Sequence, residues 1–211
     1  VAVDGPIGYK LEVPPMHPVL FSTTLQGFGE AHAQLMREFA TSHAMLALLR
    51  DGFHPQSPGG TVQLRDDGTP LLDYPITDFV WEGVRRSWLA MAELQFAAGA
   101  KRVYVVHEQC TGYASWAEAK AGIGQLPLKN QLARIVSAHV MGGCGMAADG
   151  KQGVTDAWGR YRGLGNLSVC DGSLFPTSIG ANPQLSVYGL AARNASRLAE
   201  ELTKQPAPAL A

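Results

Sequence analysis

The sequence predicts a mixed α/β fold with α+β character, because signals for both strands and helices occur along the chain. Residues 61–65 alternate apolar and polar side chains, residues 66–68 are Asp-Asp-Gly, and residues 70–76 can return as a partner strand, which together indicate a β-hairpin. Two further stretches, 78–98 and 184–202, carry apolar side chains at helical spacing. The hairpin and the helix over residues 78–98 are the clearest elements of the first 110 residues.

The composition is that of a folded chain with a sizeable core. Of the 211 residues, 46% are apolar and 17% are charged, and 17 basic residues against 18 acidic ones give a net charge of −1. No basic stripe occurs, so nucleic acid is not an expected partner. No run approaches the roughly 18 apolar residues needed to span a bilayer, so we expect no transmembrane segment.

The three cysteines, Cys110, Cys144 and Cys170, are widely spaced. They give neither a disulfide framework nor a paired metal-binding motif, so we expect no metal site. Their usage suits a reducing compartment, and we expect a cytoplasmic or peripheral membrane location. The location stays open because the start, Val-Ala-Val-Asp-Gly-Pro, has neither an initiator Met nor a signal peptide and is typical of a chain that begins within a longer one.

The other elements are predicted from shorter patterns. Residues 11–13 and 19–21 are apolar and lie among prolines, which favours short strands over helices. Residues 29–50 carry apolar side chains at helical spacing, so we expect a helix there, with an internal break. Residues 102–106 predict a short strand, and residues 115–121 carry a weak helical signal.

After residue 136 the chain becomes rich in glycine, and His139 is followed by Gly142, Gly143 and Gly145. Glycines let the backbone approach a flat ligand closely or adopt a positive φ. Histidine is the commonest general acid or base because its pKa lies near neutrality. Zinc binding by His139 and Cys144 lacks further ligands at useful spacing. No G-x-S-x-G sequence occurs, so a serine hydrolase is not expected.

A second polar phrase, Gly-Ala-Asn-Pro-Gln at 180–184, precedes the last helix. Proline is favoured in the first helical turn and holds the residue before it extended, so we expect Asn182 to be the N-cap. The free N–H groups of Gln184 and Leu185 then face outward. A helix start of this kind carries a partial positive charge and binds anionic groups, although an ordinary cap has the same sequence.

Three phrases in this order resemble the C-terminal half of the glucose–methanol–choline (GMC) family of flavin oxidoreductases. Residues 139–146 are a His with a glycine-rich tail that ends in Met, residues 169–176 have the form V-x-D-x-S-x-x-P, and residues 180–183 have the form G-x-N-P. The residues in these three motifs are most similar to those of the branch that holds the long-chain alcohol oxidases and dehydrogenases and the cholesterol oxidases.

The resemblance implies an FAD-dependent oxidation of a CH-OH group, on an alcohol that is apolar, long-chain or sterol-like. His139 would take the hydroxyl proton while the carbinol carbon delivers hydride to flavin N5. Asn182 would hydrogen-bond the same substrate oxygen. We therefore expect the His139 and Asn182 side chains to converge on one oxygen position.

The resemblance also implies which residues contact the cofactor. The helix that starts at Pro183 would point the N–H groups of Gln184 and Leu185 at the pyrimidine edge of the flavin, where its positive pole stabilises negative charge. Asp171 and Gly172 would contact the ribityl–phosphate region through backbone groups.

The family pattern divides the chain into three parts. Residues 1–134 are expected to be a substrate-binding domain, a mixed or antiparallel sheet with helices on one side, within which residues 110–134 have no assigned structure. Residues 135–205 are expected to be the C-terminal segment of the FAD-binding domain and to carry the catalytic residues, and residues 206–211 a tail.

The G-x-G-x-x-G dinucleotide fingerprint of the family is missing from the sequence, and with it the N-terminal Rossmann-type part. We expect either a C-terminal fragment or separated half of an enzyme, or a small protein that has lost flavin binding. The expected partners are the N-terminal FAD-binding half, an alcohol, and oxygen, a quinone or a cytochrome as electron acceptor. The alternative is a non-catalytic lipid- or sterol-binding module, or a degenerate fragment unable to bind FAD.

Overall fold

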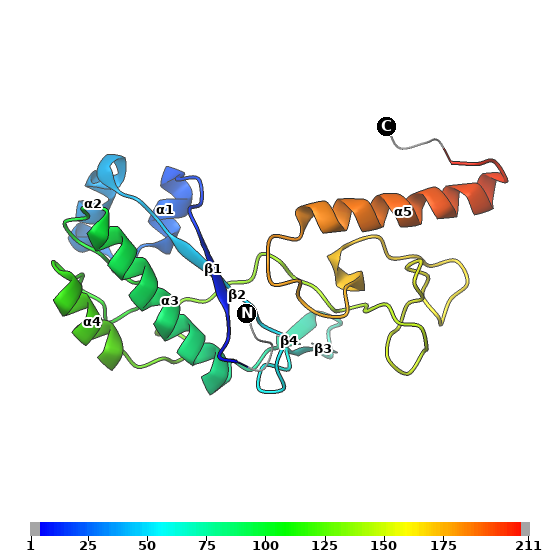
Figure 1. Ribbon diagram of the computed structural model, residues 1–211, viewed down its shortest axis with the longest axis horizontal. Helices are drawn as coiled ribbons and strands as arrows, with labels where there is room; N and C mark the ends of the chain where they lie inside the picture. Colours follow the sequence, from blue (N-terminus) through cyan, green and yellow to red (C-terminus); the bar gives the residue numbers. More distant parts are fainter. Residues whose placement is uncertain (1–4, 208–211) are drawn as a thin grey trace. The chain divides into compact units, whose positions relative to one another are not determined.

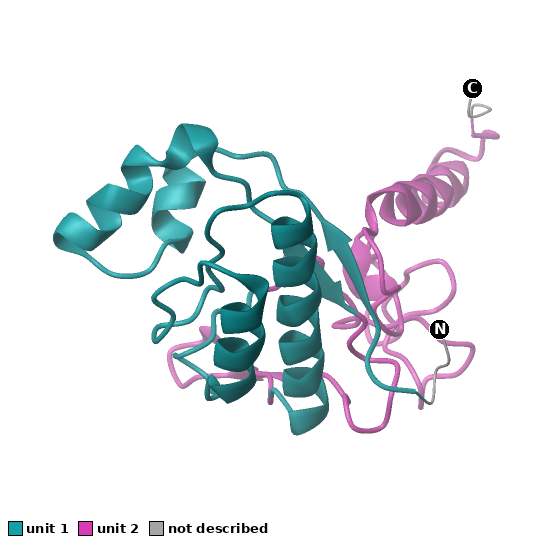
Figure 2. Cartoon of the chain, turned by 60° about the vertical axis from the view of Figure 1, so that its left-hand side comes forward, with its two compact units in different colours: residues 1–49, 76–136 teal, residues 50–75, 137–211 magenta. Residues whose placement is uncertain are grey.

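The computed structural model describes residues 5–207, which form five α-helices, two 3-10 turns and two small antiparallel sheets (Figure 1). The mixed α/β class expected from the sequence is confirmed. The chain separates into two compact units (Figure 2). Unit 1 consists of residues 1–49 and 76–136, and unit 2 of residues 50–75 and 137–211.

The elements follow one another in chain order. Unit 1 holds β1 (Tyr9–Glu12), α1 (Pro18–Thr24), α2 (Gly29–Arg37), the 3-10 turn η1 (Phe39–Thr41), β2 (Leu46–Leu49), α3 (Asp78–Ala97) and α4 (Trp116–Gln125). Unit 2 holds β3 (Thr61–Leu64), β4 (Pro70–Asp73), the 3-10 turn η2 (Gly172–Leu174) and α5 (Gln184–Thr203).

In unit 1 the long helix α3 packs against the two-stranded sheet of β1 and β2 and against α4. Gly83 allows α3 to lie close to Ile7, which precedes β1, and to Leu49 of β2. A Cβ on Gly83 would lie 2.2 Å from Cγ2 of Ile7 and 3.3 Å from Cδ2 of Leu49. The sheet is antiparallel, with Tyr9 opposite Leu49. The core of the unit is formed by Trp81, Val84, Trp88, Ala92, Val103, Val105, Ala119, Ile123, Leu126 and Ala133.

At both ends of helix α4, side chains form hydrogen bonds with backbone groups. The Ser115 hydroxyl accepts the Glu118 N–H at 3.2 Å, and the Glu118 carboxylate accepts the Ala114 N–H at 3.0 Å. This pairing satisfies two N–H groups that precede the helical ladder. At the other end, Arg85 of α3 donates to the carbonyl oxygens of Gly124 and Leu126 at 2.9 and 3.1 Å.

In unit 2 the strands β3 and β4 form the expected hairpin, with Thr61 opposite Asp73 and Leu64 opposite Pro70. Its eight strand residues are all exposed. Helix α5 is confirmed as well, and loop residues hold its outer half. The Arg193 guanidinium lies 3.7 Å from the centre of the Trp158 ring.

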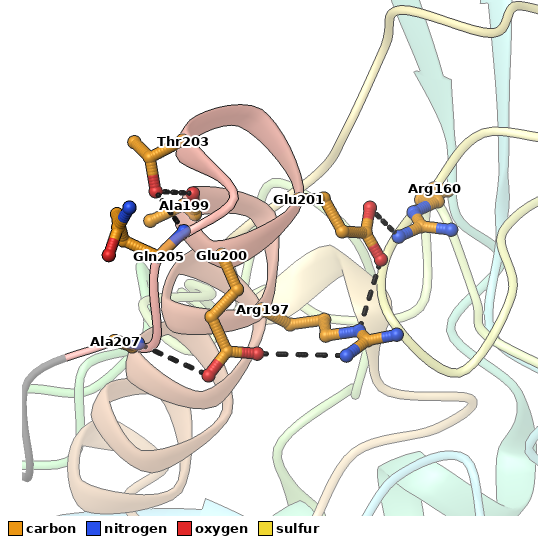
Figure 3. A network of polar contacts seen from close by, with 8 residues as sticks. All are labelled: Arg160, Arg197, Ala199, Glu200, Glu201, Thr203, Gln205 and Ala207. Atoms are coloured by element: carbon orange, nitrogen blue, oxygen red, sulfur yellow. Dashed lines mark hydrogen bonds and ion pairs between the residues drawn. The ribbon is translucent and has the colours of Figure 1, made fainter.

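The last turns of α5 are tied by ion pairs (Figure 3). Glu201 pairs with Arg160 of the loop and with Arg197 one turn back, the latter at 3.0 Å. Glu200 accepts the N–H of Ala207 at 3.2 Å, which holds the chain beyond the helix. These contacts set the direction of α5, whose other end belongs to the candidate site.

Two predicted elements are wrong. Residues 19–21 belong to the helix α1 and not to a strand, because Pro18 suits a first helical turn and His17 caps the helix by accepting the Val19 N–H at 3.3 Å. The helix expected over residues 29–50 ends at Arg37, and Leu46–Leu49 is the strand β2. A short apolar run fits a helix or a strand equally, and pairing with β1 decides here.

Two further differences are smaller. Residues 102–106 contribute only an isolated bridge, from Val103 to Tyr113. Residues 50–75, including the hairpin, group with the C-terminal unit although they precede residue 134 in the chain. The compact units therefore do not follow the single boundary that the family pattern indicates.

Candidate active site

The loop that carries His139 is joined to η2 by backbone hydrogen bonds within unit 2. The Cys144 N–H donates to the Ser173 carbonyl oxygen, and the Met146 N–H donates to the Leu174 carbonyl oxygen, each at 2.9 Å. The fully buried side chain of Leu174 anchors η2 in the unit. The first two of the three sequence phrases therefore lie side by side.

Glycines make this contact possible. Gly142 has a φ of +88°, which disfavours residues with a Cβ, and lies near the carbonyl oxygens of Phe175 and Pro176. A Cβ on Gly172 would lie 3.2 Å from the Val140 carbonyl oxygen and 3.7 Å from Cγ2 of Val187. Gly172 thus lies between the residue after His139 and the first turn of α5, the helix that follows the third motif.

His139 is half-buried on its loop. Within residues 5–207, no hydrogen bond or ion pair of its ring is formed. Both ring nitrogens therefore remain available to an external partner, as a general base requires.

Asp171 uses its carboxylate locally. It accepts the Ser173 N–H at 2.8 Å and also the Ser173 hydroxyl, and so caps η2. These hydrogen bonds, first from the hydroxyl and then from the N–H, hold the pKa of Asp171 below its ordinary value of 3.8. The side chain shapes the turn, which leaves only backbone groups of Asp171 and Gly172 for a ligand.

The start of α5 differs from the expected capping. Pro183, and not Asn182, is the N-cap residue, because its carbonyl oxygen accepts the first helical hydrogen bond, from the Val187 N–H at 2.8 Å. Asn182 lies one residue further out and is exposed.

The first three N–H groups of α5, those of Gln184, Leu185 and Ser186, precede the helical ladder. In the described part of the chain they have no hydrogen-bond acceptor. Leu185 is 84% exposed, so this end of the helix is open. Free N–H groups at a helix start suit an anionic or carbonyl ligand.

A loop far away in the sequence, residues 50–57, contacts the segment before Asn182. Thr177 donates to the Gly52 carbonyl oxygen at 2.7 Å. The sequence analysis did not predict that this loop belongs to the site. Gly52 and Gly180 are the sequence signals of the contact, since glycines permit a close approach of two backbones.

The described residues contain neither a metal-binding cluster nor a membrane-spanning helix. Between residues 5 and 207, no three His, Cys, Asp or Glu side chains are grouped so that they could hold a metal ion. None of the helices described has both the length and the apolar character needed to cross a membrane.

Comparison with known proteins identifies the family. Residues 55–191 match the family model of the GMC oxidoreductases, which is more than half of the chain. The chain therefore belongs to the GMC oxidoreductase family. The resemblance drawn from the three phrases is confirmed.

Curated relatives agree with this assignment. An uncharacterised GMC-type oxidoreductase of Sinorhizobium fredii is 24% identical over 92% of this chain and 37% of its own length. A long-chain-alcohol oxidase of Arabidopsis thaliana is 27% identical over 86% of this chain and 25% of its own length. A cholesterol oxidase of Acinetobacter baumannii is 42% identical over 27% of this chain and 10% of its own length. The chain thus spans between 25% and 37% of the length of the first two relatives.

Proposed function

We propose that this chain is the substrate- and catalysis-bearing part of an FAD-dependent enzyme that oxidises the CH-OH group of an apolar alcohol. The observation that carries the proposal is the position of Gly172, which lies between Val140, next to His139, and Val187 of α5. These contacts support the proposal, because they bring the His139 loop and the first turn of α5 to the same turn.

The residues at the start of α5 fit the cofactor. The N–H groups of Gln184, Leu185 and Ser186 have no acceptor among the described residues, and the helix pole beside them favours negative charge. Gly172 has no side chain to keep a ligand from the backbone. When bound, FAD would supply the acceptor for the hydride of the alcohol carbon.

The chain's own residues would bind the alcohol and move its proton. His139 would accept the hydroxyl proton on a ring nitrogen, since its ring has no partner among the described residues. Asn182 would donate its amide N–H to the same oxygen and so orient the alcohol. The convergence of these two side chains remains a prediction, and the contacts of Gly172 support it by holding their segments together.

The apolar class of the alcohol rests on the relatives, among them a long-chain-alcohol oxidase and a cholesterol oxidase. The proposed partners are the alcohol, an N-terminal FAD-binding part of the same enzyme, and oxygen, a quinone or a cytochrome as electron acceptor. The unmatched length of the relatives supports such an additional part.

A binding module without chemistry gains no support from the hollow in unit 1. A hollow in unit 1, lined by residues that include Met45, Trp88 and Met91, encloses about 60 Å³. Small-molecule sites usually enclose roughly 300 Å³ or more. The hollow is therefore too small for a lipid or a sterol.

The experiment compares His139→Ala with the wild type in the full-length protein loaded with FAD. Turnover of a long-chain primary alcohol should fall on the order of 10²–10⁴-fold, while the bound flavin is retained. His43→Ala is the matched control, because His43 is exposed and outside unit 2. An unchanged rate in His139→Ala would exclude His139 as the base.

A further inference from the structure

The loop of residues 50–57, here called the brace, fits closely against residues 177–180. A Cβ on Gly52 would lie 2.7 Å from the Thr177 hydroxyl oxygen, and Gly52 has a φ of +84°. The Thr177 hydroxyl donates to the Gly52 carbonyl oxygen at 2.7 Å. A side chain at Gly52 would therefore push the two segments apart.

The contact is reciprocal at Gly180. Gly180 has a φ of +67°, and a Cβ there would lie 2.5 Å from Nε and 3.1 Å from Cγ of Arg50. The Arg50 side chain thus fills the space beside the bare backbone of Gly180. Asn182 follows only two residues later, and the Gly180 N–H is itself bonded to the Ser178 hydroxyl oxygen at 3.0 Å.

The brace is held rigidly from its other side. The Asp51 carboxylate accepts hydrogen bonds from the hydroxyl groups of Ser57, which is 2% exposed, and of Tyr74, just beyond β4. The Arg50 guanidinium lies 4.8 Å from the centre of the Phe53 ring, within cation–π distance. The position of Arg50 is therefore fixed by its own loop.

The buried part of the Arg50 side chain includes a polar atom with no hydrogen-bond partner among the described residues. Its Nε is buried and has no hydrogen-bond partner in the described part of the chain. An apolar side chain of similar length would fill the same space without an unsatisfied donor. Filling space therefore does not explain an arginine at position 50. Its guanidinium stacks on Phe53, and this contact fixes where the side chain meets Gly180.

We propose that Arg50 is a positioning residue, which holds the turn at Gly180 and thereby places the Asn182 amide for the alcohol oxygen. The inference rests on the proposed function, because it takes Asn182 as the group that binds the substrate. Misplacement of a reacting group by about 1 Å can lower a rate roughly 100-fold. Arg50 itself need not touch the substrate.

The test compares three variants in the full-length protein loaded with FAD. Arg50→Ala removes the whole contact, Arg50→Met keeps an unbranched stem against Gly180 but loses the stacking on Phe53, and Arg65→Ala is a matched control on the exposed hairpin. Arg50→Ala should lower kcat about 10- to 100-fold with a smaller change in KM, Arg50→Met should be intermediate, and Arg65→Ala should leave both unchanged.

Two further measurements separate positioning from a general loss of structure. Hydrogen exchange in residues 177–187 should be faster in Arg50→Ala and unchanged in Arg65→Ala. In a double-mutant cycle, Arg50→Ala should add little to the loss caused by Asn182→Ala, because both act through the same amide. Unchanged exchange, or losses that multiply, would overturn the proposal.

The outcome also separates this proposal from the proposed function. If the wild type oxidises no alcohol, the proposed function fails, and the exchange of residues 177–187 still decides whether Arg50 holds the turn. If the wild type is active and Arg50→Ala has the wild-type kcat, the positioning role fails alone.

Discussion

At the scale of single residues, His107 shows how the structure fixes one form of a side chain. It is fully buried in unit 1, its Nδ1 accepts the Gln109 N–H at 3.0 Å, and its Nε2 lies 3.0 Å from the Pro127 carbonyl oxygen. Because Nδ1 accepts, Nε2 is the nitrogen that donates to the Pro127 carbonyl oxygen. The ring thereby joins two loops at the edge of the core.

We expect His107→Ala to lower the free energy of unfolding by about 2–4 kcal/mol, because it leaves a cavity in place of a buried ring and removes the partner of the Gln109 N–H and of the Pro127 carbonyl oxygen. Urea unfolding followed by tryptophan fluorescence measures this change. The exposed His43→Ala should stay within about 0.5 kcal/mol of the wild type. A similar loss in both variants would contradict the assigned role.

Asp171 has a pH-dependent effect of known sign. Because its folded-state pKa lies below the ordinary value of 3.8, the ionised carboxylate stabilises the folded state at higher pH, and this stabilisation is lost as the pH falls through the lowered pKa. We expect Asp171→Ala to cost about 1 kcal/mol at neutral pH. The gap to the wild type should narrow as the pH falls below 3.8, as urea titrations at neutral and at acidic pH would show. A gap that stays the same at both pH values would contradict the role of the Asp171 carboxylate.

Some site residues could be read from the sequence and others could not. His139, Asp171 and Asn182 lie in short phrases whose order carries the family resemblance. Arg50 lies 130 residues before Gly180 in the sequence, and nothing local to it indicates that contact. The capping by Pro183 was missed because the residue type alone does not decide which carbonyl oxygen accepts the first helical hydrogen bond.

At the scale of elements, Gly83 and Gly189 offer a matched pair of helical glycines. We expect Gly83→Ala in α3 to lower the free energy of unfolding by about 1–3 kcal/mol, because the added methyl collides with Ile7. Gly189→Ala in α5 meets nothing within 4 Å and should raise it by about 0.5–1 kcal/mol through helix propensity. Thermal unfolding of both variants measures the contrast. Equal stabilisation of the two would show that Ile7 does not pack closely against α3.

How well each element could be predicted from the sequence depends on its length and on the turn residues that bound it. The hairpin has a strong turn signal, and α3 and α5 have 20 residues each, over which the helical period is unambiguous. The strand β2 has four residues, and its apolar run fits either period. Only pairing with β1, more than 30 residues earlier, makes it a strand.

At the scale of the whole molecule, the hairpin exposes apolar side chains on a two-stranded sheet. Val62 and Leu72 are paired across the strands and are 63% and 72% exposed. We expect the protein of residues 1–211 to bind an apolar fluorescent dye, and the double substitution Val62→Glu/Leu72→Lys to reduce this binding. Opposite charges placed across the strands should keep the hairpin paired. Unchanged dye binding would place the apolar surface elsewhere.

The composition indicated a folded chain with a core, and the structure agrees. The grouping of residues 50–75 with the C-terminal part was not predictable, since it depends on contacts such as that of Thr177 with Gly52. Long-range contacts of this kind leave no periodic signal in the sequence.

The assembly of each unit from separated stretches has a consequence for engineering. The chain passes from one unit to the other after residues 49, 75 and 136. A single protease cut at any of these places cannot yield two complete units, because it divides at least one unit between the two fragments: unit 1 after residue 49, unit 2 after residue 136, and both after residue 75. The nicked protein should therefore stay associated until denaturant is added. For the same reason, neither unit can be exchanged between relatives as one contiguous cassette.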